Sequence, residues 1–166
     1  MGYKRVLGAK RSPIDVRDYK IKVCVAFEFP ETFELNAPPV RNQGDKPTCV
    51  AHATSSCHEY FYRLQHPDSE SADTKMSVLA IYCNRKPQWY QGEGMVIIDG
   101  AAAGTEYGDV FYSQLPGNMT YADGKSVFEA KKEELRNDAY LHRFTGYARA
   151  DGVNAIKQAL MFHGPV

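Results

Sequence analysis

The sequence predicts an α+β fold, with helices in the middle of the chain and strands towards its end. Three observations support this class. Apolar residues recur at helical spacing after Pro47, small residues cluster between residues 91 and 108, and residues 139–150 have the pattern of a strand. Helices and strands that are segregated along the chain are typical of α+β proteins.

The strongest helix is expected directly after Pro47, with Thr48 as its N-cap and its end before the polar loop at His66. Residues 1–39 ahead of it contain period-two fragments broken by prolines, which indicates extended chain or edge strands. The apolar positions of the helix step by three and four residues and are expected to form its buried face: Val50, Ala53, Cys57, Phe61 and Leu64.

Shorter helices are expected further along the chain. One begins after Ser77, which is able to cap it, and another follows the capping box that Ser126 makes with Glu129. Between them, residues 91–108 are expected to form a loop that leads into a small-residue helix packed closely on its neighbours. In the closing helix Asp151 is the expected cap and Gly164 the C-terminal stop. One face of this last helix is expected to carry its apolar side chains: Val153, Ile156 and Leu160.

Length and charge exclude several classes of function. At 166 residues the chain fits one domain or two closely packed lobes. Lys plus Arg and Asp plus Glu each number 20, so no field of one sign attracts nucleic acid or an acidic membrane surface. No segment has the ~20 apolar residues of a membrane span, and the N-terminus lacks the apolar stretch of a signal peptide. We therefore expect no nucleic-acid or membrane partner, and a cytoplasmic or virus-associated location.

The four cysteines are expected to be free thiols, because they lack the tight spacing of a disulfide framework and no secretion signal precedes them. The series Cys49, His52, Cys57 and His58 does not favour zinc, since side chains at these positions of one helix cannot all face a single point. We expect no metal and no cofactor.

Cys49 is a candidate nucleophile. A cysteine attacks a carbonyl carbon as thiolate, and a helix N-terminus favours the thiolate through unpaired N–H groups and the macrodipole. The resulting oxyanion needs preorganised donors, which the Gln43 amide and the backbone N–H of Cys49 can supply if the turn between them folds the amide back. From the residues alone, a buried structural cysteine beside a surface glutamine remains the alternative.

The segment PPVRNQGDKPTCVAHATS resembles the active-site segment of papain-like cysteine peptidases. Five residues fall where the family has them: Val40, Gln43, Gly44, Cys49 and Ala51. The segment MSVLAIYCNR is similar to the family's next helix, and AIKQALMFHGPV is similar to the start of its second lobe. The resemblance implies that Cys49 is the nucleophile and Gln43 the oxyanion glutamine. It also implies a helical lobe over residues 1–136 and the beginning of a β-rich lobe over residues 137–166.

Other parts of the family pattern match less well. The glycine-rich strip that binds the substrate backbone maps only loosely, to Gly92, Gly94 and Met95. Lys46 stands where typical members have a disulfide-forming cysteine, and Val50 replaces the aromatic residue after the nucleophile. Substrate preference therefore does not carry over from the family.

The resemblance also implies a histidine base and an orienting asparagine about 130–150 residues after the cysteine, which falls beyond Val166. His52 and His58 share the nucleophile's helix and cannot swing in front of it, while the remaining histidines match positions that the family does not use: His66, His142 and His163. We therefore expect the sequence to be truncated, so that a further chain segment completes the β-rich lobe.

The expected function is a cysteine endopeptidase that hydrolyses a peptide or protein substrate through a thioester on Cys49, once a histidine and an asparagine are supplied beyond residue 166. Two alternatives stay open. A papain-like fold can lose catalysis and serve as a binding or structural protein, or it can act as an amidase or transferase on something other than protein.

Overall fold

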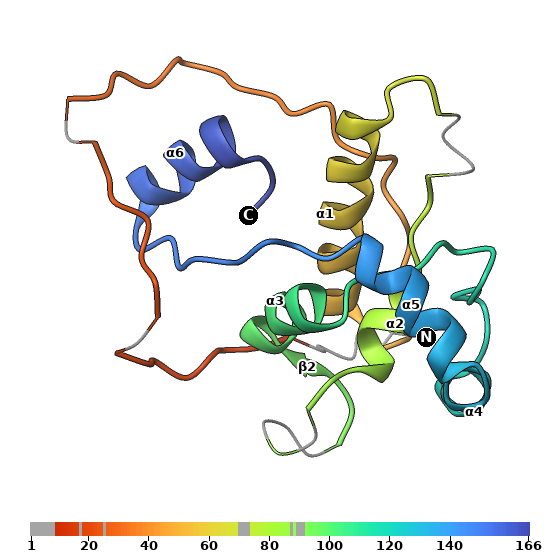
Figure 1. The fold of residues 1–166 in the computed structure, drawn as a ribbon. Coiled ribbons are helices and arrows are strands. Elements are labelled where there is room, and N and C mark those ends of the chain that lie inside the picture. Colours follow the sequence, from red (N-terminus) through yellow and green to blue (C-terminus); the bar gives the residue numbers. More distant parts are fainter. Residues whose placement is uncertain (1–8, 17, 25, 70–73, 87, 89–91) are drawn as a thin grey trace, which may run out of the picture.

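The computed structural model describes residues 9–16, 18–24, 26–69, 74–86, 88 and 92–166 (Figure 1). The predicted α+β class is confirmed, since six helices and a two-stranded sheet form within these residues. In chain order the elements are β1 (Ala9–Lys10), α1 (Cys49–Gln65), α2 (Val78–Cys83), β2 (Met95–Val96), α3 (Ile97–Glu106), α4 (Tyr121–Ala130), α5 (Lys132–Leu141) and α6 (Val153–His163).

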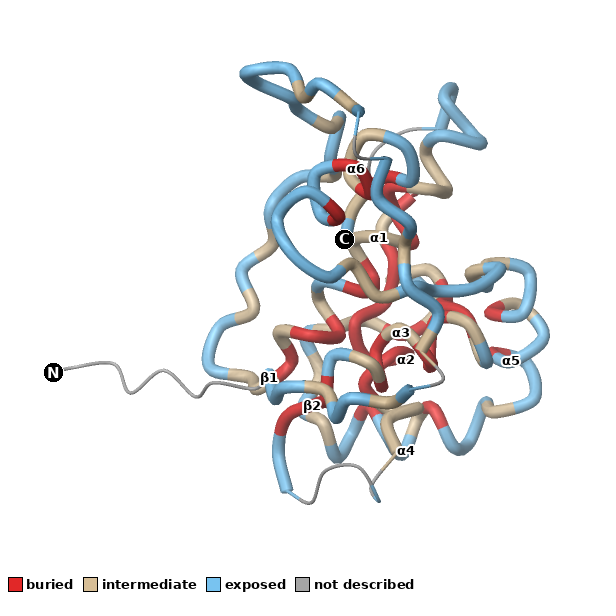
Figure 2. Tube along the Cα trace, turned by 90° about the vertical axis from the view of Figure 1, so that its left-hand side faces the viewer, coloured by how far each residue is buried: buried red, intermediate tan, exposed pale blue. Residues whose placement is uncertain are grey.

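Helix α1 is the centre of the fold, because α2, α3 and β2 all pack against it. Figure 2 shows that buried residues gather where α1, α2 and α3 meet, while most of the N-terminal segment is exposed. The helix begins after Thr48 and ends at Gln65, as predicted. Thr48 occupies the N-cap position, but its hydroxyl contacts Nδ1 of His52 at 3.1 Å and no backbone amide.

The predicted buried face of α1 is correct only in part. Val50 is buried, and Cys57 and Phe61 are half-buried, but Ala53 is exposed and Leu64 is 60% exposed. The buried face is instead rich in polar groups: Thr54, Ser55, His58 and Glu59. A central helix is covered by the elements that pack on it, whatever its periodicity, so polar side chains of α1 are buried as well as apolar ones.

Arg41 is the main partner of this polar face. Its Nη1 donates a hydrogen bond to the carbonyl of Met76 at 2.8 Å. Its Nη2 lies 3.4 Å from the Ser56 hydroxyl and 3.4 Å from the carboxylate of Glu59. We call Arg41, Ser55, Ser56, Glu59 and Asp109 the Arg41 cluster. The cluster joins the loop before α1, helix α1 itself and the segment after α3, which carries Asp109. The bond from Arg41 to the Met76 carbonyl adds the segment before α2.

Asp109 is the most deeply buried carboxyl group of the cluster, with no exposed surface. One carboxyl oxygen accepts a hydrogen bond from the Val110 amide at 2.8 Å, and the Ser55 hydroxyl also stabilises the carboxylate. Burial nevertheless dominates and raises the pKa of Asp109 from 3.8 to about 7, although Arg41 acts in the opposite direction. Burial likewise raises the pKa of Glu59.

Helices α2 and α3 begin near the predicted positions. The Ser77 hydroxyl accepts a hydrogen bond from the Ala80 amide at 3.3 Å and donates one to the Leu115 carbonyl at 2.6 Å, so the predicted cap is confirmed. In α3 the glycines allow a close approach to α1: a Cβ on Gly100 would lie 2.6 Å from the Thr54 hydroxyl. The small-residue pattern thus gives the tight helix packing that it predicts.

Helices α4 and α5 contribute to a core cluster that includes Leu79, Val110 and Phe128, and here two predictions are wrong. Helix α4 begins after Thr120, whose hydroxyl accepts a hydrogen bond from the Asp123 amide at 3.2 Å, so Ser126 lies inside the helix instead of capping it. Helix α5 runs on to Leu141, which removes the start of the strand predicted over residues 139–150. Packing decides this case, because Ala139 is buried in that cluster with Leu135.

What remains of the predicted strand is a parallel bridge between Arg149 and Lys20 of the N-terminal segment. Of the edge strands expected within residues 1–39, the described residues form β1, and beyond it they contain only turns, a bend and the bridge at Lys20. The sheet itself pairs β1 with β2 in parallel, Ala9 opposite Met95 and Lys10 opposite Val96. Residue 136 lies inside α5, so a border between two lobes, which stays a prediction, would have to follow that helix.

Helix α6 packs on the N-terminal segment, beside which it lies in Figure 1. Gln158 holds the backbone of Cys24 from both sides, accepting from its amide at 3.0 Å and donating to its carbonyl at 2.8 Å. Gly164 follows the helix as predicted, with a φ of 90°. The predicted cap is wrong, because Gly152 precedes the helix and Asp151 instead pairs with Lys20 at 2.8 Å.

The predicted apolar face of α6 is not its buried face. Val153 is 67% exposed and Ile156 is 41% exposed, whereas Ala155, Gln158 and Ala159 are buried. None of the helices in the described part of the chain has the length and apolar character that crossing a membrane requires.

Asp109 makes the stability of the fold depend on pH. Its folded-state pKa of about 7 lies above the ordinary value of 3.8, so the folded protein holds a proton that the unfolded chain releases between these values. The free energy of unfolding should therefore fall as pH rises from about 4 to 7. Asp109→Asn should remove this part of the slope, measured by urea unfolding at several pH values. Wild-type and variant profiles that run parallel would contradict the assignment.

Gly108 should tolerate no side chain. Its φ is +82°, and a Cβ would lie 1.9 Å from the carbonyl oxygen of Ala139 in α5. We expect Gly108→Ala to lower the free energy of unfolding by at least about 2 kcal/mol, because both the backbone conformation and the helix contact become strained. Gly146→Ala is the matched control, since a Cβ there meets nothing within 4 Å. Equal stability of the two variants would refute the packing of Gly108 against α5.

Candidate functional site

Cys49 is the first residue of α1, the position in which the helix presents its free N–H groups. The residue is half-buried and packs against a core cluster that includes Val50, Tyr82 and Met95. The other thiol of this helix differs in its surroundings, because burial raises the pKa of Cys57 to about 11. Burial also raises the pKa of Cys83 in α2 to about 12. All four cysteines are free.

Two hydrogen bonds to the same carbonyl group, that of Lys46, stabilise the turn before Cys49. The carbonyl oxygen of Lys46 accepts from Nε2 of Gln43 at 2.6 Å and from the Thr48 amide at 2.9 Å. The turn itself is set by Gly44, which has a φ of 63° and whose amide donates to the Asn42 side chain at 2.8 Å. The Gln43 amide is thus folded back along the turn that leads into the helix, and its nitrogen keeps one further hydrogen for donation.

Lys46 also fixes this turn from the outside. Its ammonium group donates hydrogen bonds to the carbonyls of Gly117 and Met119, both at 2.8 Å. The chain ahead of α4 therefore buttresses the turn that carries Gln43. Sequence reasoning identified the departure at Lys46 but not this role, because the two carbonyls lie about 70 residues further along and carry no sequence signal.

The three residues of the expected substrate strip lie next to one another but differ in exposure. Gly92 is exposed, whereas Gly94 and Met95 are buried. Met95 pairs with Ala9 in the sheet, and its side chain belongs to the core cluster on which Cys49 packs. The fold thus brings the end of the strip and Cys49 to one cluster. A substrate-binding role for Gly92, Gly94 and Met95 stays a prediction.

Two of the five histidines are held within α1. Nδ1 of His52 lies 3.0 Å from the carbonyl of Thr48, one turn back in the same helix, and burial lowers its pKa. His58 is buried, stacks on the ring of Phe144 with 3.7 Å between centroids, and has its pKa lowered to about 3. His58 is therefore a neutral core residue at physiological pH.

The other three histidines lie away from the start of α1 in sequence and in their contacts. His66 and His142 both pack against Tyr62 at the far end of α1. Burial lowers the pKa of His142. His163 is exposed at the end of α6. No described contact joins any of these three side chains to Cys49 or Gln43.

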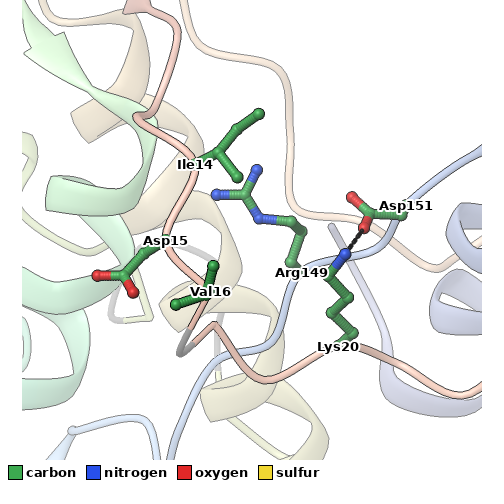
Figure 3. A pocket seen from close by; sticks show the side chains of 6 residues that line it. All are labelled: Ile14, Asp15, Val16, Lys20, Arg149 and Asp151. Atoms are coloured by element: carbon green, nitrogen blue, oxygen red, sulfur yellow. Dashed lines mark ion pairs between the residues drawn. The ribbon is translucent and has the colours of Figure 1, made fainter.

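A recess of about 320 Å³ lies between the N-terminal segment and the chain before α6 (Figure 3). It is lined by Ile14, Asp15, Val16, Lys20, Arg149 and Asp151. Lys20 points to Asp151, and Arg149 donates to the carboxylate of Asp18. None of the predicted site residues contributes to it. Within the described residues, no group of three or more His, Cys, Asp or Glu side chains is placed to hold a metal ion.

A scan against protein-family models found no match to this chain, and a search of the curated proteins found none either. Among solved structures, the chain resembles xylellain, a cysteine protease from Xylella fastidiosa, with a TM-score of 0.71 and 21% sequence identity. The match covers 95% of this chain and 63% of that protein, so the chain spans less than two thirds of the neighbour's length. The chain thus has the fold of a cysteine protease over nearly all of its residues.

Proposed function

We propose that this chain carries the nucleophile and oxyanion-binding part of a cysteine peptidase. The observation that supports this most directly is the position of Cys49, at the first residue of the central helix in a fold shared with a cysteine protease. Gln43 supports it further, since its amide is held on the turn that leads to that residue. A peptide or protein is the proposed substrate.

In the proposed reaction the thiolate of Cys49 attacks the carbonyl carbon of a peptide bond. The negative charge that develops on the carbonyl oxygen is stabilised by the Gln43 amide and the backbone N–H of Cys49. The carbon–nitrogen bond then breaks, the amine leaves with a proton from an imidazolium, and a thioester remains on Cys49. Water hydrolyses the thioester, and its proton returns to the imidazole.

The proposed base is a histidine outside this sequence, oriented by an asparagine that also lies outside it. The contacts of the histidines support this: His52 contacts the Thr48 carbonyl, His58 stacks on Phe144, and within the described residues no contact joins the other three to the turn. The segment that supplies the base would also cover the exposed apolar side chains of α6, Val153 and Phe162 among them. Without it, a binding protein that lacks catalysis is the competing proposal.

Cys49 should be the first thiol of its helix to be alkylated. With limiting iodoacetamide at neutral pH, we expect its labelling to outpace that of Cys57 and Cys83 at least about tenfold, because the raised pKa values of these two leave little thiolate. Peptide mass spectrometry of the folded protein measures the three rates. Unfolded protein is the control, in which the rates should converge. Equal rates in the folded protein would overturn the assignment of Cys49.

The 166-residue chain alone should have negligible peptidase turnover. General acid–base catalysis typically contributes 10²–10⁴-fold, so a chain extended beyond Val166 should cleave a peptidyl-coumarin substrate at least about 10²-fold faster. Cys49→Ser in the longer chain is the control and should abolish cleavage. Efficient, Cys49-dependent turnover by the 166-residue chain would contradict the proposed external base and direct attention to His163.

A further inference from the structure

The strip at residues 92–94 has a backbone that must be held in place by other groups. Gly92 and Gly94 have φ values of 98° and 106°, a region that other residues rarely adopt. Glycine at both positions leaves the strip with many accessible conformations when nothing constrains it. A strip that binds an extended peptide has to present its N–H and C=O groups in one fixed orientation.

Arg85 supplies this constraint from the turn after α2. Its Nη1 lies 2.7 Å from the carbonyl oxygen of Gly92 and 2.8 Å from that of Gly94. The same nitrogen lies 3.1 Å from the Tyr82 hydroxyl. Because this nitrogen carries two hydrogens, the two short contacts to carbonyls are direct bonds and the Tyr82 contact is shared. One charged group thus holds both glycine carbonyls.

Tyr82, a buried core residue, contacts both the strip and Arg85. Its hydroxyl accepts a hydrogen bond from the Gly94 amide at 2.9 Å, and its ring lies under the Arg85 guanidinium, 4.6 Å from carbon to centroid. The ring of Tyr121 lies 5.2 Å from the same guanidinium. Tyr82 also belongs to the core cluster on which Cys49 packs, so the strip and the candidate nucleophile are fixed to a common support.

The hydrogen bonds to Arg85 and Tyr82 occupy main-chain groups of the two glycines but not those of Glu93 between them. The carbonyls of Gly92 and Gly94 and the Gly94 amide are all engaged inwards. Glu93 between them is exposed, and its N–H and C=O have no hydrogen-bond partner in the described part of the chain. Residues 92–94 form a bend in which the carbonyls of Gly92 and Gly94 both bond to Arg85, so the main-chain groups of Glu93 are the ones that remain for pairing with a peptide.

We propose that Arg85 is a positioning residue for substrate binding: by holding the carbonyls of Gly92 and Gly94, it fixes the main-chain groups of Glu93 for pairing with an extended peptide. The inference rests on the proposed function, because it assumes that the strip lies along the substrate of Cys49. Arg85 acts through the strip and does not contact the reacting atoms.

Two alkylating agents with the same chloromethyl ketone group separate peptide recognition from thiol reactivity. Chloroacetone measures the reactivity of Cys49, and benzyloxycarbonyl-Phe-Ala-chloromethyl ketone adds a peptide that can pair with the strip. The ratio of the two second-order rate constants at Cys49 is the readout. In the wild-type chain, and in a chain extended beyond Val166, we expect the peptidyl reagent to react at least about tenfold faster.

Arg85→Met should lower this ratio at least about tenfold and leave the chloroacetone rate unchanged. The ratio of Arg85→Lys should lie between those of Arg85→Met and the wild type. Tyr82→Phe should lower the ratio less than Arg85→Met does. If Arg85→Met does not fold, these two variants decide the question. Arg136→Met is the matched control, since Arg136 lies over the ring of Tyr107 and does not touch the strip. Its ratio should equal that of the wild type.

An unchanged ratio in the folded Arg85 variants would overturn the inference, and so would a wild-type ratio of one. Either result is compatible with a reactive Cys49 and leaves the proposed function standing. Failure of the proposed function has a different signature, namely a chloroacetone rate at Cys49 no higher than that at Cys57. A fall of the ratio in the Arg85 variants, with the chloroacetone rate preserved, supports the inference.

Discussion

The Arg41 guanidinium beneath α1 is the constraint on which the rest of the structure depends. It binds the Met76 carbonyl just before α2 and pairs with Glu59 in the middle of α1, while its own backbone leads into the turn of Gln43. Three segments that are distant in sequence are thereby held by one charge. A substitution of Arg41 would leave the buried Glu59 carboxyl without its cation, and removing one partner of a buried ion pair typically costs about 3–5 kcal/mol.

Hydrogen bonds to backbone carbonyls hold the candidate site, which follows Arg41 in the sequence. The carbonyl of Lys46 accepts hydrogen bonds from the Gln43 side-chain amide and the Thr48 backbone amide. The ammonium group of Lys46 donates to the Gly117 carbonyl. Charged hydrogen bonds of this kind join the turn to the chain ahead of α4. The same device recurs at Arg85, where a cation holds the carbonyls of the glycine strip.

Tertiary packing, and not the local pattern, selected which side chains are buried. On α1 the apolar spacing pointed to Ala53 and Leu64, yet the helix buries Ser55 and Glu59, and the ion pair between Arg41 and Glu59 compensates part of this polarity. The strand predicted over residues 139–150 gave way to α5 for a related reason. Ala139 completes a core cluster as part of a helix, and the pattern of the segment could not reveal that cluster.

The sequence by itself determined the local features: the start of α1 after Thr48 and the cap at Ser77. These depend on residues within one or two helical turns of each other, so their physical cause is contained in the segment. The sequence also singled out Cys49 and Gln43, whose roles stay proposals. Only the tertiary structure decided the partners of Arg41 and Arg85, because each holds carbonyl groups from other segments. Every residue carries a carbonyl, so no residue type marks which carbonyl a folded chain will bring to a cation.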